Sequence, residues 1–136
     1  MEQYQFRFPE EGKFLGFEND SNICYANSAI QVLFHCRPFR EQVLAWKPAN
    51  KDKYYLINEL ADLFRVMAGA KSSRGTINHR RFIARIRAGN QLFNNDEHHD
   101  SHEFISWLID EVHMNLREDF RFSLTKKLSS KDYQKE

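Results

Sequence analysis

The sequence has few cysteines and no long apolar run. Its 136 residues include only Cys24 and Cys36, with no CxxC pair, which does not indicate a disulfide framework. In one continuous helix these two Cα atoms would lie about 18 Å apart, whereas a disulfide needs less than about 7 Å. No stretch approaches the roughly eighteen apolar residues of a membrane span, and residues 1–3 do not begin a signal peptide. Free thiols suit a reducing compartment, so we expect an intracellular protein.

The chain also lacks an excess of charge of either sign. Twenty Lys and Arg residues face 19 Asp and Glu residues, a formal net charge of +1. Such a balance argues against nucleic acid or an anionic membrane as the main partner. Hydrophobic residues make up 41% of the chain, which is ordinary for a globular protein, and the length supports one domain with a modest core.

Apolar residues recur at helical spacing along most of the chain, which predicts a mainly α fold. Helices are expected from about residues 24, 38, 54 and 78, and from 97 or 98 to 116, with Asn78 and Asp96 as caps. Residues 71–75 are predicted to form a loop, and residues 121–136 a disordered or severed tail. The predicted core residues are Tyr25, Ala29, Val32 and Leu33; Phe39, Val43 and Leu44; Leu56, Leu60, Leu63, Phe64 and Met67; Phe82, Ile83 and Ile86; and Phe104, Ile105, Leu108, Ile109, Val112 and Leu116.

One cysteine, Cys24, lies where the polar, Asn-rich run from Gly16 becomes an apolar helix. The first N–H groups of a helix have no intrahelical partner, and the helix dipole places partial positive charge there, so a thiolate is favoured. The amides of Asn19 and Asn22 could donate hydrogen bonds to charge developing on a carbonyl oxygen. The alternative is a small buried cysteine after a loop.

Residues 16–33 resemble the cysteine box of the ubiquitin-specific proteases, and a second block about eighty residues later resembles the family's acidic helix. Three further segments, residues 36–41, 60–64 and 82–87, are most similar to the small members that WD-repeat proteins activate. The resemblance covers roughly residues 8–118. The matching positions are Gly16, Asn19, Asn22, Cys24, Tyr25, Asn27, Ser28, Gln31 and Leu33 in the first block, and Asp100, Glu103 and Phe104 in the second.

The resemblance implies the helical thumb subdomain of a papain-like cysteine peptidase, α+β when complete. The implied function is a thiol-dependent deubiquitinase, a ubiquitin carboxyl-terminal hydrolase that cleaves after the C-terminal glycine of ubiquitin and needs no cofactor or metal. Cys24 would be the nucleophile and Asn19 would stabilise the oxyanion. Asp100 and Glu103 would contact the ubiquitin tail, or would simply be solvated carboxylates at a helix N-terminus.

The resemblance also divides the chain and shows departures. We expect a lead-in over residues 1–15, the thumb part over 16–118, and a tail or truncated continuation over 119–136. The resemblance implies that the family's general-base region and the regions that bind WD-repeat activators lie outside this chain. Whether the chain is active by itself therefore stays open. Ser21 replaces a glycine, which would strain a turn needing positive φ. Asp20 works against thiolate formation, and His98 and His99 replace paired glutamines.

Two alternatives remain beside the truncated deubiquitinase. The chain could be a non-catalytic helical module that binds ubiquitin or another partner without turnover. It could instead bind zinc, since His98 and His102 would be an i, i+4 pair on one helix face. None of the six histidines matches the family's general base, and His35 would lie three turns from Cys24, out of hydrogen-bond reach.

Overall fold

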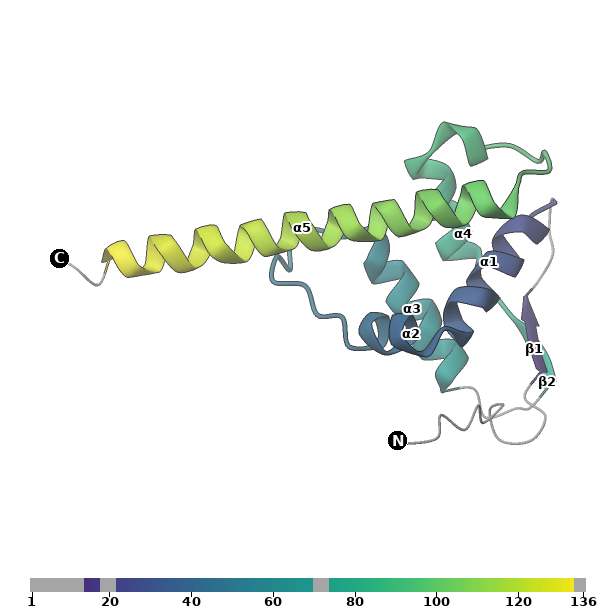
Figure 1. Ribbon diagram of the computed structural model, residues 1–136, viewed down its shortest axis with the longest axis horizontal. Helices are drawn as coiled ribbons and strands as arrows, with labels where there is room; N and C mark the ends of the chain where they lie inside the picture. Colours follow the sequence, from purple (N-terminus) through teal and green to yellow (C-terminus); the bar gives the residue numbers. More distant parts are fainter. Residues whose placement is uncertain (1–13, 18–21, 70–73, 134–136) are drawn as a thin grey trace.

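The computed structural model describes residues 14–17, 22–69 and 74–133 (Figure 1). This part of the chain is mainly α-helical, which confirms the predicted fold class. Its elements, in chain order, are β1 (Phe14–Phe17), α1 (Cys24–His35), α2 (Arg37–Leu44), α3 (Leu56–Ala68), β2 (Arg74–Ile77), α4 (Arg80–Gly89), the 3-10 helix η1 (Gln91–Phe93) and α5 (Ser101–Tyr133).

The two strands form a small parallel pair. Phe14 pairs with Arg74 and Phe17 pairs with Ile77. Parallel strands require a crossover connection, and α1, α2 and α3 supply it between β1 and β2. Because β2 includes residues 74 and 75, the loop predicted over 71–75 is wrong at those two positions, while residues 71–73 lie outside the described part. Residues 18–23 connect the end of β1 to the start of α1.

The core lies where α5 packs across α1 and α3 (Figure 1). Phe104 and Leu108 of α5 are fully buried, as are Leu60 and Phe64 of α3. Phe34 of α1 meets the Phe64 ring edge to face, with 5.2 Å between ring centroids. Burial of each such side chain contributes about 1.5–3 kcal/mol. The packing of α5 on α1, which includes the contact of Phe104 with Tyr25, places the two sequence blocks in one region.

Some residues of the predicted core are exposed. Val32 is 60% exposed, because the buried face of α1 is centred on Ala26 and Ile30 and leaves Val32 on the solvent side. Ile109 and Leu116 are also exposed, since α5 buries the narrower stripe of Phe104, Leu108 and Val112. The other predicted core residues are buried or pack partly buried against the core.

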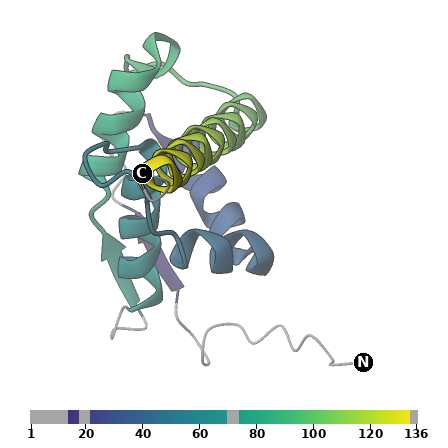
Figure 2. The ribbon, with the colours of Figure 1, turned by 90° about the vertical axis from the view of Figure 1, so that its left-hand side faces the viewer.

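The last helix differs from its predicted bounds at both ends. It begins at Ser101, and Asp100 rather than Asp96 caps it, because Asp100 Oδ1 accepts a hydrogen bond from the His102 N–H at 2.7 Å. It continues to Tyr133, so the disordered tail is wrong for residues 121–133. The distal part of α5 projects beyond the other helices in Figure 1 and points towards the viewer in Figure 2.

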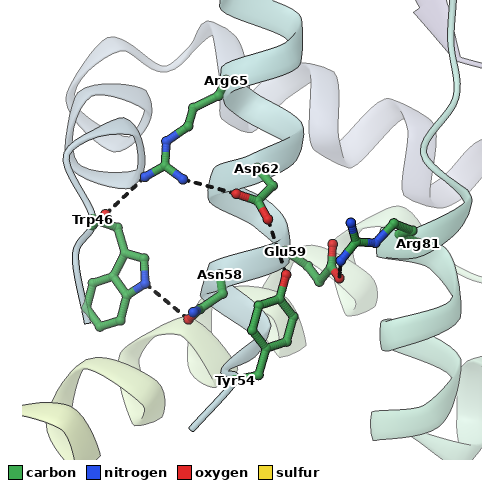
Figure 3. Close-up of polar contacts among 7 residues, drawn as sticks. All are labelled: Trp46, Tyr54, Asn58, Glu59, Asp62, Arg65 and Arg81. Carbon is green, nitrogen blue, oxygen red and sulfur yellow. Dashed lines mark hydrogen bonds and ion pairs between the residues drawn. The ribbon is translucent and has the colours of Figure 1, made fainter. Parts of the chain in front are cut away.

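A polar network ties α3 to its neighbours (Figure 3). The Trp46 indole donates to Asn58 Oδ1, and Arg65 bonds both to the Trp46 carbonyl and to Asp62. Arg81 of α4 pairs with the buried carboxylate of Glu59 at 3.1 Å. Burial, followed by the nearby carboxylates of Glu59 and Asp62, raises the pKa of Tyr54 to about 12. The network therefore connects α3 both to the residues that follow α2 and to α4.

Among the residues that the structure describes, no helix combines the length and the apolar character needed to cross a membrane.

Candidate active site

Cys24 is the first residue of α1, and its side chain is exposed to solvent. The N-cap residue, Ile23, makes no side-chain hydrogen bond to the first turn, while its carbonyl accepts the N–H groups of Ala26 and Asn27 at 3.0 Å each. The start of α1 therefore presents its first amides and the positive end of its dipole beside the thiol. The alternative of a small buried cysteine is wrong.

Tyr25 anchors the start of α1 inside the molecule. Its ring lies 5.1 Å from His99, 5.5 Å from Phe104 and 5.7 Å from Phe93, measured between centroids. Burial raises the pKa of the Tyr25 phenol, and the positive charge of Arg87 opposes that rise. Because the neighbouring side chain is held in this aromatic cluster, Cys24 is directed outward from a fixed first turn.

The residue two before the cysteine has a left-handed backbone. Asn22 has φ of +54°, a conformation that asparagine adopts more readily than most residues. Its side-chain N–H donates to the Asp96 carbonyl at 2.9 Å, so in this structure its amide is a tie to the segment before α5. The strain predicted at Ser21 falls on a residue outside the described part of the chain.

The fold brings the two sequence blocks together. Asn22 bonds to Asp96, and Tyr25 contacts both His99 and Phe104, so the start of α1 lies beside the start of α5. Figure 1 shows these two helix ends side by side. Predicted site residues that are about eighty positions apart in the chain therefore share one region of the surface.

Asp100 and Glu103 both lie at the start of α5 and are exposed. Asp100 Oδ1 accepts the N–H groups of His102 at 2.7 Å and Glu103 at 3.4 Å, which makes Asp100 the cap of this helix. Glu103 lies in the first turn, where the helix dipole favours a negative charge. Their predicted contact with a ubiquitin tail stays a prediction, as does the role of Asn19, which lies outside the described residues.

The histidines near this region are held by asparagines. His99 Nε2 lies 2.8 Å from Asn95 Oδ1, and His79 Nε2 lies 2.6 Å from Asn27 Oδ1. Because α5 begins at Ser101, His98 precedes the helix and does not form an i, i+4 pair with His102 on one helix face. The geometric basis of the zinc alternative is therefore wrong, and the described ranges contain no group of three or more suitable metal ligands.

Comparison with known proteins shows the family to which the chain belongs. The sequence profile described as ubiquitin carboxyl-terminal hydrolase matches residues 15–135. The chain belongs to the ubiquitin carboxyl-terminal hydrolase family. The match extends past the limit of residue 118 that the motifs suggest, and it includes nearly all of α5.

Two curated relatives illustrate the similarity. Ubiquitin carboxyl-terminal hydrolase 12 of Salmo salar is 40% identical over 113 residues, or 83% of this chain. Ubiquitin carboxyl-terminal hydrolase 4 of Arabidopsis thaliana is 42% identical over 108 residues, or 78% of this chain. The chain spans 30% of the length of each of these relatives.

Within this member of the ubiquitin carboxyl-terminal hydrolase family, the sequence patterns miss one residue beside the site. His79 is buried, and its ring contacts the side chain of Asn27. Asn27 lies about one helical turn after Cys24 in α1. Its only sequence signal is a histidine at the end of an Ile-Asn-His run before a helix, which indicates nothing about a contact with residue 27. The contact forms only when the tertiary fold brings the residue before α4 to the first turn of α1.

Proposed function

We propose that this chain carries the nucleophile of a thiol-dependent deubiquitinase, with Cys24 as the attacking residue. The observation that carries the proposal is the exposed Cys24 thiol at the start of α1, where the N-cap residue, Ile23, makes no side-chain bond to the first amides. Family membership and the names of both relatives support the same reaction. The substrate would be the carbonyl of the C-terminal glycine of ubiquitin in its bond to another protein.

The reaction would begin with bond formation between Cys24 sulfur and that carbonyl carbon. The carbonyl electron pair moves onto oxygen, and its return breaks the bond to the leaving amine, which departs with a proton. Water then hydrolyses the thioester and regenerates the thiol. Asn19 and the backbone N–H of Cys24 would donate to the oxyanion, and loss of one such donor typically costs about 100- to 1,000-fold in rate.

Asp100 and Glu103 would bind the basic, extended tail of ubiquitin. Both are exposed at the start of α5, beside the start of α1. The capping of α5 by Asp100 is compatible with this role, because both capping bonds go to Oδ1. The two carboxylates would thereby guide the ubiquitin terminus towards Cys24.

Further parts of the proposal concern what surrounds this chain. We assign no general base to its described residues, since none of the six histidines matches the family's general base. Residues 16–118 would be the thumb part of a longer catalytic domain, and residues 119–133 a helical continuation. The exposed free thiols Cys24 and Cys36 suit an intracellular location. A WD-repeat activator would contact regions outside this chain.

The second candidate function is a non-catalytic module that binds ubiquitin or another partner. The observation that favours it is the Asn22 amide, a candidate oxyanion donor, which donates instead to the Asp96 carbonyl at 2.9 Å. Under this alternative, replacement of Cys24 leaves binding intact, whereas under the first it abolishes function.

Covalent capture tests the first proposal. The full chain is mixed with ubiquitin that carries a thiol-reactive electrophile at its C-terminus, and adducts are located by mass spectrometry. We expect an adduct with wild type and with Cys36→Ala, and none with Cys24→Ala. Cys36 is the matched control because it is also free and exposed, at the opposite end of α1.

Two outcomes would count against a nucleophilic Cys24. The first is the absence of an adduct from a chain whose circular dichroism shows it to be folded. The second is an adduct on Cys36 alone. If binding of unmodified ubiquitin persists in either case, the module is the better description.

A further inference from the structure

The side chain of His79 lies between the two elements that flank the segment before Cys24. It is 3% exposed and directly precedes α4. Its ring stacks on the Phe17 ring, with 4.6 Å between centroids and 16° between planes. Its Nε2 atom lies 2.6 Å from Asn27 Oδ1. One buried side chain therefore contacts both β1 and α1.

Both contacts fall at the ends of the same short segment. Phe17 is the last residue of β1, and residues 18–23 connect it to Cys24. Asn27 lies in the first turn of α1, where its backbone N–H bonds to the Ile23 carbonyl. Residues i and i+3 lie on neighbouring positions of a helix face, so Asn27 is beside Cys24. Movement of His79 would therefore shift Phe17 and Asn27 relative to each other.

The chemistry of the His79–Asn27 contact gives it a direction. The amide oxygen of Asn27 is an acceptor, so Nε2 of His79 carries the hydrogen and donates. The bond fixes the orientation of the Asn27 side chain, and the stacked Phe17 ring fixes the plane of the imidazole. Two different side-chain properties, a donor and a flat ring, are therefore used at one position.

We propose that His79 is a positioning residue for Cys24. It acts through Asn27 and Phe17 to hold the first turn of α1 against the end of β1. The inference rests on the proposed role of Cys24 as nucleophile. It goes beyond that role by assigning the reactivity of the thiol to a buried contact made from a different element.

Two substitutions at position 79 separate the properties. His79→Gln keeps a side-chain N–H donor, and His79→Phe keeps a stacked ring but loses the donor. The first readout is the rate of Cys24 alkylation by iodoacetamide divided by that of Cys36 in the same chain, measured by peptide mass spectrometry. Because Cys36 is a second exposed thiol, at the far end of α1, it serves as an internal reference for reagent concentration, and circular dichroism confirms that each variant is folded.

We expect His79→Phe to lower the Cys24 to Cys36 ratio by about threefold or more, because a misplaced first turn aligns its amides less well with the thiol. His79→Gln should stay within about twofold of wild type. With the ubiquitin electrophile, His79→Phe should lower the maximal labelling rate and leave the half-saturating probe concentration unchanged. A purely structural role would lower thermal stability and leave the ratio in the folded protein unchanged.

Asn27→Leu removes the acceptor of the same bond and keeps the inference testable if His79→Phe does not fold. Its effect on the ratio should match that of His79→Phe, and the double variant should add nothing further. Equal ratios in wild type and both single variants would overturn the inference, as would an equal fall in His79→Gln. If the ubiquitin probe labels no variant while the ratio still responds to His79→Phe, the proposed function fails and the positioning role stands.

Discussion

Asp119 shows how a single charged residue can be accommodated inside this molecule. Its side chain is on α5 and only 6% of the residue is exposed. Oδ2 accepts the N–H of Ala49 at 2.8 Å, and Oδ1 accepts the N–H of Asn50 at 2.9 Å. Burial first, and the negative charge of Asp119 next, raise the pKa of the neighbouring Tyr55 phenol. The buried carboxylate is therefore matched by two backbone N–H groups of the loop between α2 and α3.

The substitution Asp119→Asn should be strongly destabilising for its size. It places an amide N–H₂ against a backbone donor, and one unsatisfied buried group costs about 1–3 kcal/mol in the free energy of unfolding. Urea unfolding followed by circular dichroism measures the loss. The matched control is Glu118→Gln, next to it on the helix, whose exposed ion pair with Lys53 should contribute less than about 1 kcal/mol. Equal losses in the two variants would contradict this account of Asp119.

At the scale of the element, α3 depends on another helix for its cap. Its own N-cap residue, Tyr55, makes no side-chain hydrogen bond to the first turn. Instead, Asn115 Oδ1 of α5 accepts the N–H of Ile57 at 3.2 Å. An acceptor supplied from a different helix serves the same physical purpose as a local cap, because the first amides of α3 lack intrahelical partners. The start of α3 is therefore coupled to the position of α5.

We expect Asn115→Ala to lower the free energy of unfolding by about 1 kcal/mol, the usual loss when a helix cap is removed. Asn115→Asp should retain most of the stability, because it keeps an oxygen acceptor and adds a favourable charge at a helix N-terminus. Chemical denaturation of both variants provides the measurement, with Met114→Ala, at an exposed position on the same helix, as control. The trans cap would be excluded if Asn115→Asp were as unstable as Asn115→Ala.

At the scale of the whole molecule, α5 presents an apolar stripe that no described residue covers. The stripe consists of Leu116, Phe120, Leu124 and Leu128, which are all exposed and recur every four residues. Phe120 alone is 64% exposed. The helix projects from the other elements along this part of its length (Figure 1). An exposed run of this kind favours dye binding and aggregation.

The double substitution Leu124→Glu with Leu128→Glu should separate solubility from stability. Both side chains are exposed, so the free energy of unfolding should stay within about 0.5 kcal/mol of wild type. Binding of a hydrophobic dye and self-association in sedimentation velocity should both fall. Val66→Glu, at a single exposed apolar position on α3, serves as the control and should leave dye binding unchanged. A large loss of stability in the double variant would show that the stripe is covered within the monomer.

Several features could be predicted because they depend on local physics. The spacing of Leu56, Leu60 and Phe64 predicts a helix, and α3 contains all three as buried residues. The change from an Asn-rich run to an apolar one predicts a helix start at Cys24, and α1 begins there. The helical extension of α5 is missed when the Lys-rich composition of residues 121–133 is interpreted as disorder. Lysine, arginine and leucine are also good helix formers, and the structure shows a helix there.

The sequence by itself determined the helical fold class, the cysteine at a helix start and the family, because periodicity, helix-start chemistry and residue identity all act over short distances along the chain. Only the tertiary structure decided that β1 pairs with β2, that Asn115 caps α3, and that His79 lies against Asn27. Each of these contacts joins residues far apart in sequence. A pattern of neighbouring residues carries no information about such pairs, since they form only when the helix faces pack.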